Sequence, residues 1–298
     1  MNDVIQYAQL PAPVRAEVQR LSRAPAVAWP TLLLGLCCIA GYLASDWLGW
    51  TRVIPLWAAA LVNGVMGYCA FSVIHDSIHR AVSTRVRLND WAARLILLLE
   101  TPWVNLELFR WAHIQHHRHS GGGRDPDQWV QGPWWQLPLR WMFIDVFYLY
   151  YVVARGDAVA RKHFRSTRRY AAVCAVLALA LTALGHGPEV LMLWLIPSRI
   201  SQLLLGFAFF WLPHAPHDTA QADNFTRATT VRLGHEWLLS PLLQWQNYHL
   251  IHHLLPATPF YNNRRLWLLL EPQLRRHELA IQHGFAIQPT IHPAQQGA

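Results

Sequence analysis

Long apolar stretches dominate the chain and determine the fold that we expect. A membrane-spanning helix needs about 20 mostly apolar residues. Four segments meet or approach that requirement, namely 30–48, 53–74, 170–184 and 188–212. The connection between the first two is short, and so is the connection between the last two. The pattern therefore predicts four transmembrane helices arranged as two antiparallel hairpins.

Two further apolar segments are interrupted by polar residues. Segment 95–109 contains Glu and Asn side chains, and segment 134–154 contains Arg140 and Asp145 among many Trp and Tyr residues. Such mixtures are typical of amphipathic helices in the headgroup region of a bilayer. We expect interfacial helices in both places, and a full span by 134–154 is the alternative.

The rest of the chain completes an all-α integral membrane protein with no second globular domain. Residues 1–28 are polar and lack the apolar core and cleavage site of a signal peptide, so we expect a cytoplasmic N-terminal segment. Residues 29–287 form the expected membrane domain. Residues 288–298 are expected to be a disordered tail.

The composition agrees with a chain that faces lipid. Charged residues make up 14% of the 298 residues, whereas an ordinary soluble domain has roughly 25%. The net charge of +8 comes mainly from Arg, which gathers before the first and third predicted spans and after the second and fourth. By the positive-inside rule, both termini of this multi-pass protein lie in the cytoplasm, inside an inner or plasma membrane. Nothing in the basic pattern indicates nucleic-acid binding.

Three short segments are rich in histidine. HDSIH occupies residues 75–79, HIQHH residues 113–117 and HLIHH residues 249–253. Their histidines recur three or four residues apart, which places them on one face of a helix. All three segments lie on the predicted cytoplasmic side. We therefore expect them to meet in a histidine cage carried by a cytoplasmic helical cap.

So many imidazoles in one place indicate a metal centre. The sequence has no HExxH motif, which argues against a zinc-protease site, and a haem would use two axial histidines at most. Imidazole suits iron, copper, nickel and zinc. Eight or nine nitrogen ligands would serve two metal ions with open positions. Two irons can activate O2, and beside lipid they would oxidise an unactivated C–H bond.

The three segments resemble the histidine boxes of the membrane-bound fatty acid desaturase and hydroxylase superfamily, in the expected order and over most of the chain. The resemblance implies an oxygen-dependent, non-haem diiron enzyme. Carried onto this sequence, it implies iron ligation by His75, His79, His113, His116, His117, His249, His252 and His253. The superfamily often adds a ninth histidine after the fourth span. WLPHAPHDT offers His214 and His217, and we favour His214 as the ligand, which leaves His217 in the outer shell.

Further polar residues are candidates for roles around the metals. Asp76, Asp125 and Asp127 could accept the second N–H of a ligating imidazole, and a plain polar turn at RDPDQW is the alternative for the last two. Asn247 could bridge to a metal through water or begin a helix. Arg199 interrupts the fourth span, where a charge is costly. We expect Arg199 to bind a substrate headgroup or a carboxylate of the boxes.

The sequence leaves the lipid substrate open. It has no Gly-rich nucleotide fingerprint and no haem-domain signature, so electrons are expected from a separate protein, such as an acidic ferredoxin steered to the basic face. A fatty acyl desaturase or hydroxylase is our first hypothesis. A carotenoid hydroxylase or ketolase is the alternative, because HRHSGGGRDPDQW and NYHLIHHLLPATPFYN are similar to desaturase-type carotenoid hydroxylases. A metal transporter is a third hypothesis, although transport sites usually lie near the bilayer midplane.

Overall fold

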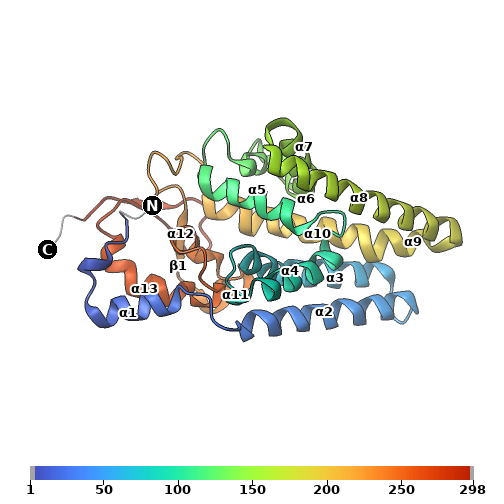
Figure 1. The fold of residues 1–298 in the computed structure, drawn as a ribbon, viewed down its shortest axis with the longest axis horizontal. Coiled ribbons are helices and arrows are strands. Elements are labelled where there is room, and N and C mark those ends of the chain that lie inside the picture. The colour runs from blue at the N-terminus through green and yellow to red at the C-terminus, as the bar shows by residue number, and fades with distance from the viewer. Residues whose placement is uncertain (1–3, 296–298) are drawn as a thin grey trace.

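The computed structural model describes residues 4–295, and these are mostly helical. In Figure 1 the long helices lie along the longest axis, while α1, α12, α13 and β1 gather at one end. The helices are α1 Ala12–Leu21, α2 Trp29–Trp50, α3 Leu56–Ile78, α4 Val86–Glu100, α5 Leu106–His119, α6 Leu137–Met142, α7 Ile144–Arg155, α8 Ala158–Leu181, α9 Gly187–Glu189, α10 Ile196–Leu205, α11 Glu236–Leu242, α12 His249–Leu254 and α13 Asn263–Leu274. Short π-helical segments occur at Thr182–His186, Val190–Leu195 and Gly206–Trp211.

Helices α2 and α3 form the first predicted hairpin. They match the predicted spans 30–48 and 53–74 to within about one helical turn. Pro30 lies in the first turn of α2, where the missing N–H of proline has no helical partner to lose. Asn63 Nδ2 on α3 donates to Asp46 Oδ1 on α2 across 2.6 Å and helps to hold the pair together. Because α3 runs past its predicted end, the HDSIH segment forms its last turn.

A single helical run, Ala158–His214, supplies the second predicted hairpin. It folds back at Gly185, whose φ of 93° lies in the left-handed region that glycine adopts readily. Figure 1 shows α8 on one arm and α9 and α10 on the other. The predicted spans 170–184 and 188–212 fall on these arms. Helix α8 begins about three turns before its predicted span, because the basic residues that precede the apolar stretch are also helical.

The apolar helices indicate a membrane protein. Three stretches, α2, α3 and the folded run Ala158–His214, are long and apolar enough to cross a membrane. Large apolar side chains on the outer faces of these helices are exposed, for example Trp47 on α2 and Leu179 on α8, at 68% and 70%. Exposed apolar surface on this scale is favourable in lipid and costly in water.

Each of the two interrupted apolar segments is broken into two helices. Segment 95–109 contains the end of α4 and the start of α5, because Asn105 accepts a hydrogen bond from the backbone N–H of Leu108 and so caps α5. Segment 134–154 is bent by 81° between Trp134–Met142 and α7. Helices therefore occur in both segments, as predicted, but each segment contains a break that the sequence pattern did not reveal.

A small sheet, which the sequence pattern did not predict, accompanies the predominantly helical fold. Within residues 4–295, strands β1 Thr230–Leu233, β2 Leu279–His283 and β3 Thr290–His292 form a sheet in that order. Strand β1 pairs with β2 in parallel, and β2 pairs with β3 antiparallel. The predicted disordered tail at 288–298 thus contains a strand, which pairs along the free side of the buried strand β2. Residues 296–298 of that prediction lie outside the described part of the chain.

The N-terminal segment packs against the same end of the molecule as the sheet. Its residues Ile5, Val18 and Leu21 are buried in a core that also contains Trp267 of α13 and Ile281 of β2. This core supports α12, which carries the third histidine segment.

Candidate metal centre

Three helices present the histidine segments to one another. HDSIH ends α3, HIQHH lies in the C-terminal half of α5, and HLIHH makes up most of α12. Because one helical turn takes 3.6 residues, the spacing in each segment aligns its imidazoles on one face. The structure brings these three faces together, as the sequence predicted, and their histidines form two groups.

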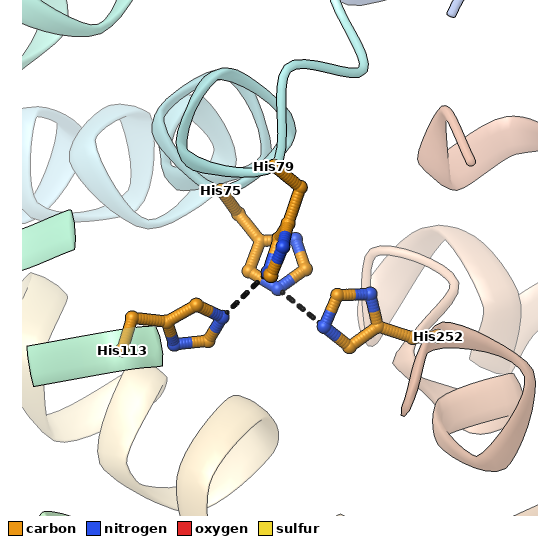
Figure 2. Close-up of side chains that lie close together, drawn as sticks. All are labelled: His75, His79, His113 and His252. Atoms are coloured by element: carbon orange, nitrogen blue, oxygen red, sulfur yellow. Dashed lines mark hydrogen bonds between the residues drawn. The ribbon is translucent and has the colours of Figure 1, made fainter. Parts of the chain in front are cut away.

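The first group consists of His75, His79, His113 and His252. One ring nitrogen from each lies within 4.8 Å of those of the other three. The contacts are 2.9 Å between Nε2 of His113 and Nε2 of His79, and 3.1 Å between Nε2 of His75 and Nε2 of His252 (Figure 2). These rings come from all three predicted boxes.

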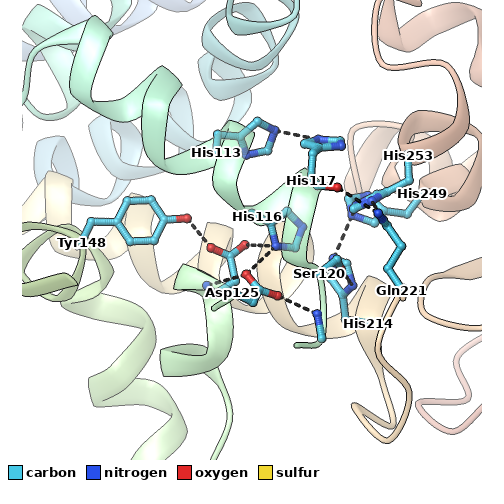
Figure 3. Close-up of polar contacts among 12 residues, drawn as sticks. His113, His116, His117, Ser120, Asp125, Tyr148, His214, Gln221, His249 and His253 are labelled. Carbon is cyan, nitrogen blue, oxygen red and sulfur yellow. Dashed lines mark hydrogen bonds and ion pairs between the residues drawn. The ribbon is translucent and has the colours of Figure 1, made fainter. Parts of the chain in front are cut away.

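The second group consists of His116, His214, His249 and His253, and its four nitrogens also lie within 4.8 Å of one another. Nε2 of His249 is 3.0 Å from Nε2 of His214 and 3.1 Å from Nε2 of His253 (Figure 3). All four residues are buried. Of the two histidines weighed for the ninth position, His214 belongs to this group and His217 does not.

His117 lies between the two groups. Its Nε2 is 3.1 Å from Nε2 of His113 and 2.9 Å from Nε2 of His252, both in the first group. Its ring stacks on His253 of the second group, with 4.3 Å between the ring centroids. All nine histidines predicted as ligands therefore lie in one continuous cluster.

The cluster fits bound cations better than a network of neutral hydrogen bonds. In a neutral imidazole each ring nitrogen carries either one proton or one lone pair. Nε2 of His113 and Nε2 of His252 each contact two other Nε2 atoms at about 3 Å, so one such nitrogen cannot satisfy both neighbours. Burial and neighbouring histidines lower the pKa of His253 well below its usual value, and neutral imidazole is the form that binds metals. Converging lone pairs at these separations are the donor set that a metal ion requires.

Two carboxylates hold one ring of the second group. Nδ1 of His116 lies 2.9 Å from Asp125 Oδ1 and 3.2 Å from Asp127 Oδ2. Burial alone would lower the pKa of His116, but Asp127 and Asp125 outweigh it and raise this pKa to about 9. Asp127 in turn accepts a hydrogen bond from the hydroxyl of Tyr148 (Figure 3). With its Nδ1 proton held in this way, His116 directs Nε2 into the group.

Gly121, the first of the three glycines after the second box, is required by its backbone conformation and by a close neighbour. Gly121 has a φ of 71°, and its N–H donates to Asp125 Oδ2 at 2.8 Å. A Cβ at this position would lie 2.6 Å from the backbone oxygen of Thr219. The close approach of these two loops places Asp125 beside His116.

Two of the predicted site residues have other partners. Asp76 accepts from Thr31 Oγ1 at 2.9 Å and lies 3.3 Å from the N–H of Phe260, so it joins α2, α3 and the segment after α12 and holds no imidazole. Arg199 pairs with Asp145 at 2.7 Å. Its partner is therefore not a carboxylate of the boxes, and its predicted contact with a substrate headgroup stays a prediction. In both cases the observed partner lies far away in the sequence, so no local pattern could have predicted it.

His217, which is partly buried, and Asn247, which is buried, lie close to the cluster without a hydrogen bond to any of its rings. Nε2 of His217 and Oδ1 of Asn247 have no partner among the described residues, while Asn247 Nδ2 donates to Ser240 Oγ. Their predicted outer-shell roles stay predictions.

Three acceptors were missed by the sequence reasoning. Gln246 Oε1 lies 2.6 Å from Nδ1 of His249, and Gln221 Oε1 lies 3.3 Å from Nδ1 of His253. The backbone oxygen of Ala228 lies 3.2 Å from Nδ1 of His214. Gln246 precedes His249 by three residues and could have been found from that spacing, whereas the other two lie in loops with no local signal.

A small apolar cavity adjoins the first group. Phe71 lines it one helical turn before His75, and Ala112 lines it directly before His113. Other apolar lining residues include Leu97, Leu108, Leu149, Leu205 and Phe210, and Glu100, Asp145 and Gln202 are among the polar ones. A hydrophobic molecule in this cavity would place its C–H bonds beside the histidine cluster.

Comparisons with known proteins agree with this site. The family model described as "Fatty acid desaturase" matches residues 51–285. The chain is 25% identical over 237 residues to the beta-carotene ketolase of Paracoccus sp. (strain PC1). The aligned region covers 78% of this chain and 88% of that protein. It is 28% identical over 196 residues to the beta-carotene ketolase of Paracoccus sp. (strain N81106 / MBIC 01143), covering 64% of this chain and 70% of that protein.

The chain therefore belongs to the fatty acid desaturase family, and the resemblance inferred from its histidine boxes is confirmed. Together with its relatives, it is an oxidoreductase of the membrane desaturase and oxygenase type.

Proposed function

We propose that this chain is an O2-dependent, non-haem diiron oxygenase that acts on a carotenoid. The observation that carries the proposal is the pair of four-histidine groups, joined by His117, beside an apolar cavity. Iron accepts imidazole ligands, and two ions would give each group one cation. The residues that would hold them are His75, His79, His113 and His252 in one group and His116, His214, His249 and His253 in the other, with His117 between them.

The bound irons would supply redox chemistry with O2. The protein would orient the substrate and keep water out of the site. Phe71 and Phe210 line the cavity next to the cluster and exclude water from it. Asp125 and Asp127 fix the orientation of His116, while Gln246 fixes that of His249. No side chain in the cavity needs to act as a covalent nucleophile.

A carotenoid is favoured as the substrate because both relatives described above are beta-carotene ketolases. Fatty acyl desaturation or hydroxylation is the second candidate, and it is favoured by the family that the chain matches. The family assignment gives no support to a metal transporter.

The surroundings of the site fit an electron donor that binds from the cytoplasm. The first half of α8 exposes a row of cations, Arg161, Lys162, Arg165, Arg168 and Arg169. By the positive-inside rule this end of α8, and with it the histidine cluster and both termini, would lie in the cytoplasm of a multi-pass membrane protein. An acidic ferredoxin would be steered to such a surface.

Expression of the gene in two hosts, one that makes β-carotene and one that makes only fatty acids, tests the substrate. We expect carotenoids that have gained oxygen in the first host, and fatty acids of unchanged mass and unsaturation in both. A ketone would appear as a gain of one oxygen with the loss of two hydrogens, and an alcohol as a gain of one oxygen alone. New double bonds or hydroxyl groups in the acyl chains, with unchanged carotenoids, would favour the second candidate. The His249→Ala variant serves as the inactive control.

A further inference from the structure

The two histidine groups differ in what supports their rings from outside. In the second group every Nδ1 faces an acceptor, so each Nε2 is directed inward. The acceptors are Asp125 and Asp127 for His116, the Ala228 carbonyl for His214, Gln246 for His249 and Gln221 for His253. These contacts fix the tautomer and the rotation of all four rings.

In the first group, no Nδ1 atom has a hydrogen-bond acceptor among residues 4–295. Nδ1 of His75 and Nδ1 of His113 are buried without a hydrogen-bond partner. His79 and His252 make their hydrogen-bond contacts through Nε2 alone. The carboxylate nearest in sequence, Asp76, is bonded to Thr31 and to the backbone of Phe260 instead.

We propose that the two metal positions are unequal, and that the second group fills first and retains its ion while the first group holds the exchangeable ion. This inference rests on the proposed function, since it requires a metal at both groups. An acceptor on Nδ1 makes the imidazole a stronger ligand, and the loss of such a partner typically costs 10- to 100-fold in metal affinity. The second group has an acceptor for each of its four rings, and two of these acceptors carry negative charge near the cation.

The position of the cavity gives this difference a functional meaning. Phe71, which lines the cavity, lies 6.3 Å from His75 between ring centroids, and Phe209 lies 5.5 Å from the same ring. Ala112, also in the lining, directly precedes His113. The exchangeable ion therefore lies on the substrate side, where weaker support leaves its ligand rings freer to adjust when substrate enters.

Titration of the full-length protein with Co²⁺ tests the inference without relying on activity. Metal-free protein in detergent micelles would be titrated, and bound cobalt would be measured by elemental analysis and by its absorption spectrum. We expect two ions per chain in two steps that differ at least about 10-fold in affinity. A chelator should remove the weakly held ion first and leave one ion per chain.

Variants assign the two steps to the two groups. His252→Ala should abolish the weak step and leave one tightly bound cobalt per chain. Asp125→Asn removes the charge beside His116 but keeps the shape of the side chain, and Gln246→Ala removes the acceptor of His249. Each should weaken the tight step by about 10- to 100-fold and leave the weak step unchanged. Thermal unfolding of the metal-free variants shows whether they remain folded. Asp125→Asn and Gln246→Ala act on different rings, His116 and His249, so the same effect in both would assign the tight step to the second group.

The outcomes separate this inference from the proposed function. Two ions bound with equal affinity, or loss of the tight step in His252→Ala, would overturn the inequality of the sites. A wild-type protein that binds fewer than two cobalt ions would instead count against the dinuclear centre itself.

Discussion

Replacing His249 by alanine should reduce product formation by at least about 100-fold, because the change removes a ring from the centre of the second group. Nε2 of His249 contacts Nε2 of His214 and Nε2 of His253 at 3.0 and 3.1 Å. Outer partners of metal ligands are worth up to about 100-fold, and a direct ligand should be worth no less. Product analysis in the carotenoid-producing host measures the loss of activity. Elemental analysis of the purified variant measures its metal content.

His119→Ala is the matched control for this variant. His119 is partly exposed, lies two residues after His117 on α5 and belongs to neither group. We expect His119→Ala to keep the activity and metal content of the wild type. Unchanged turnover in His249→Ala, at wild-type expression levels, would mean that this ring has no part in the reaction.

Leu149→Trp should lower turnover by about 100-fold while the metal content stays the same. Leu149 lines the apolar cavity from α7, so the larger ring would occupy space that the substrate needs. A misplacement of substrate by about 1 Å can already cost about 100-fold in rate. The turnover of a carotenoid by purified protein with an artificial reductant, together with elemental analysis, would separate a blocked cavity from a lost metal.

Val146→Trp provides the comparison on the same helix. Val146 is 55% exposed and lies outside the cavity lining. Its replacement should leave turnover within about twofold of the wild type, since an exposed apolar position of this helix tolerates a larger apolar side chain. If Leu149→Trp and Val146→Trp were equally active, the cavity would not be the substrate site.

The parts of the fold that could be predicted are those governed by local patterns. The apolar runs predicted α2 and α3 to within about a turn, and the spacing of the three histidine segments predicted which rings share a helix face. The breaks at Asn105 and near Phe143 were missed, because a cap and a bend require only a few residues within a continuous apolar pattern. The sheet was missed for a similar reason, since strands of three to five residues give too few alternations to detect.

Contacts between distant residues explain the errors around the site. Asp76 lies within a histidine box and yet bonds Thr31 and Phe260, because the last turn of α3 points this side chain away from the cluster. Arg199 forms an ion pair with Asp145 on α7, a partner that no local sequence pattern reveals. In contrast, Asp125 and Asp127 lie shortly after their own histidine helix, and the sequence offered them either as acceptors for an imidazole or as part of a plain polar turn.

The most direct test of the dinuclear centre is anomalous X-ray scattering at the iron absorption edge, from crystals of the protein purified with its native metal. The account predicts two iron peaks per chain. One should be enclosed by His75, His79, His113 and His252, and the other by His116, His214, His249 and His253. A single peak, or iron peaks remote from both groups, would contradict it.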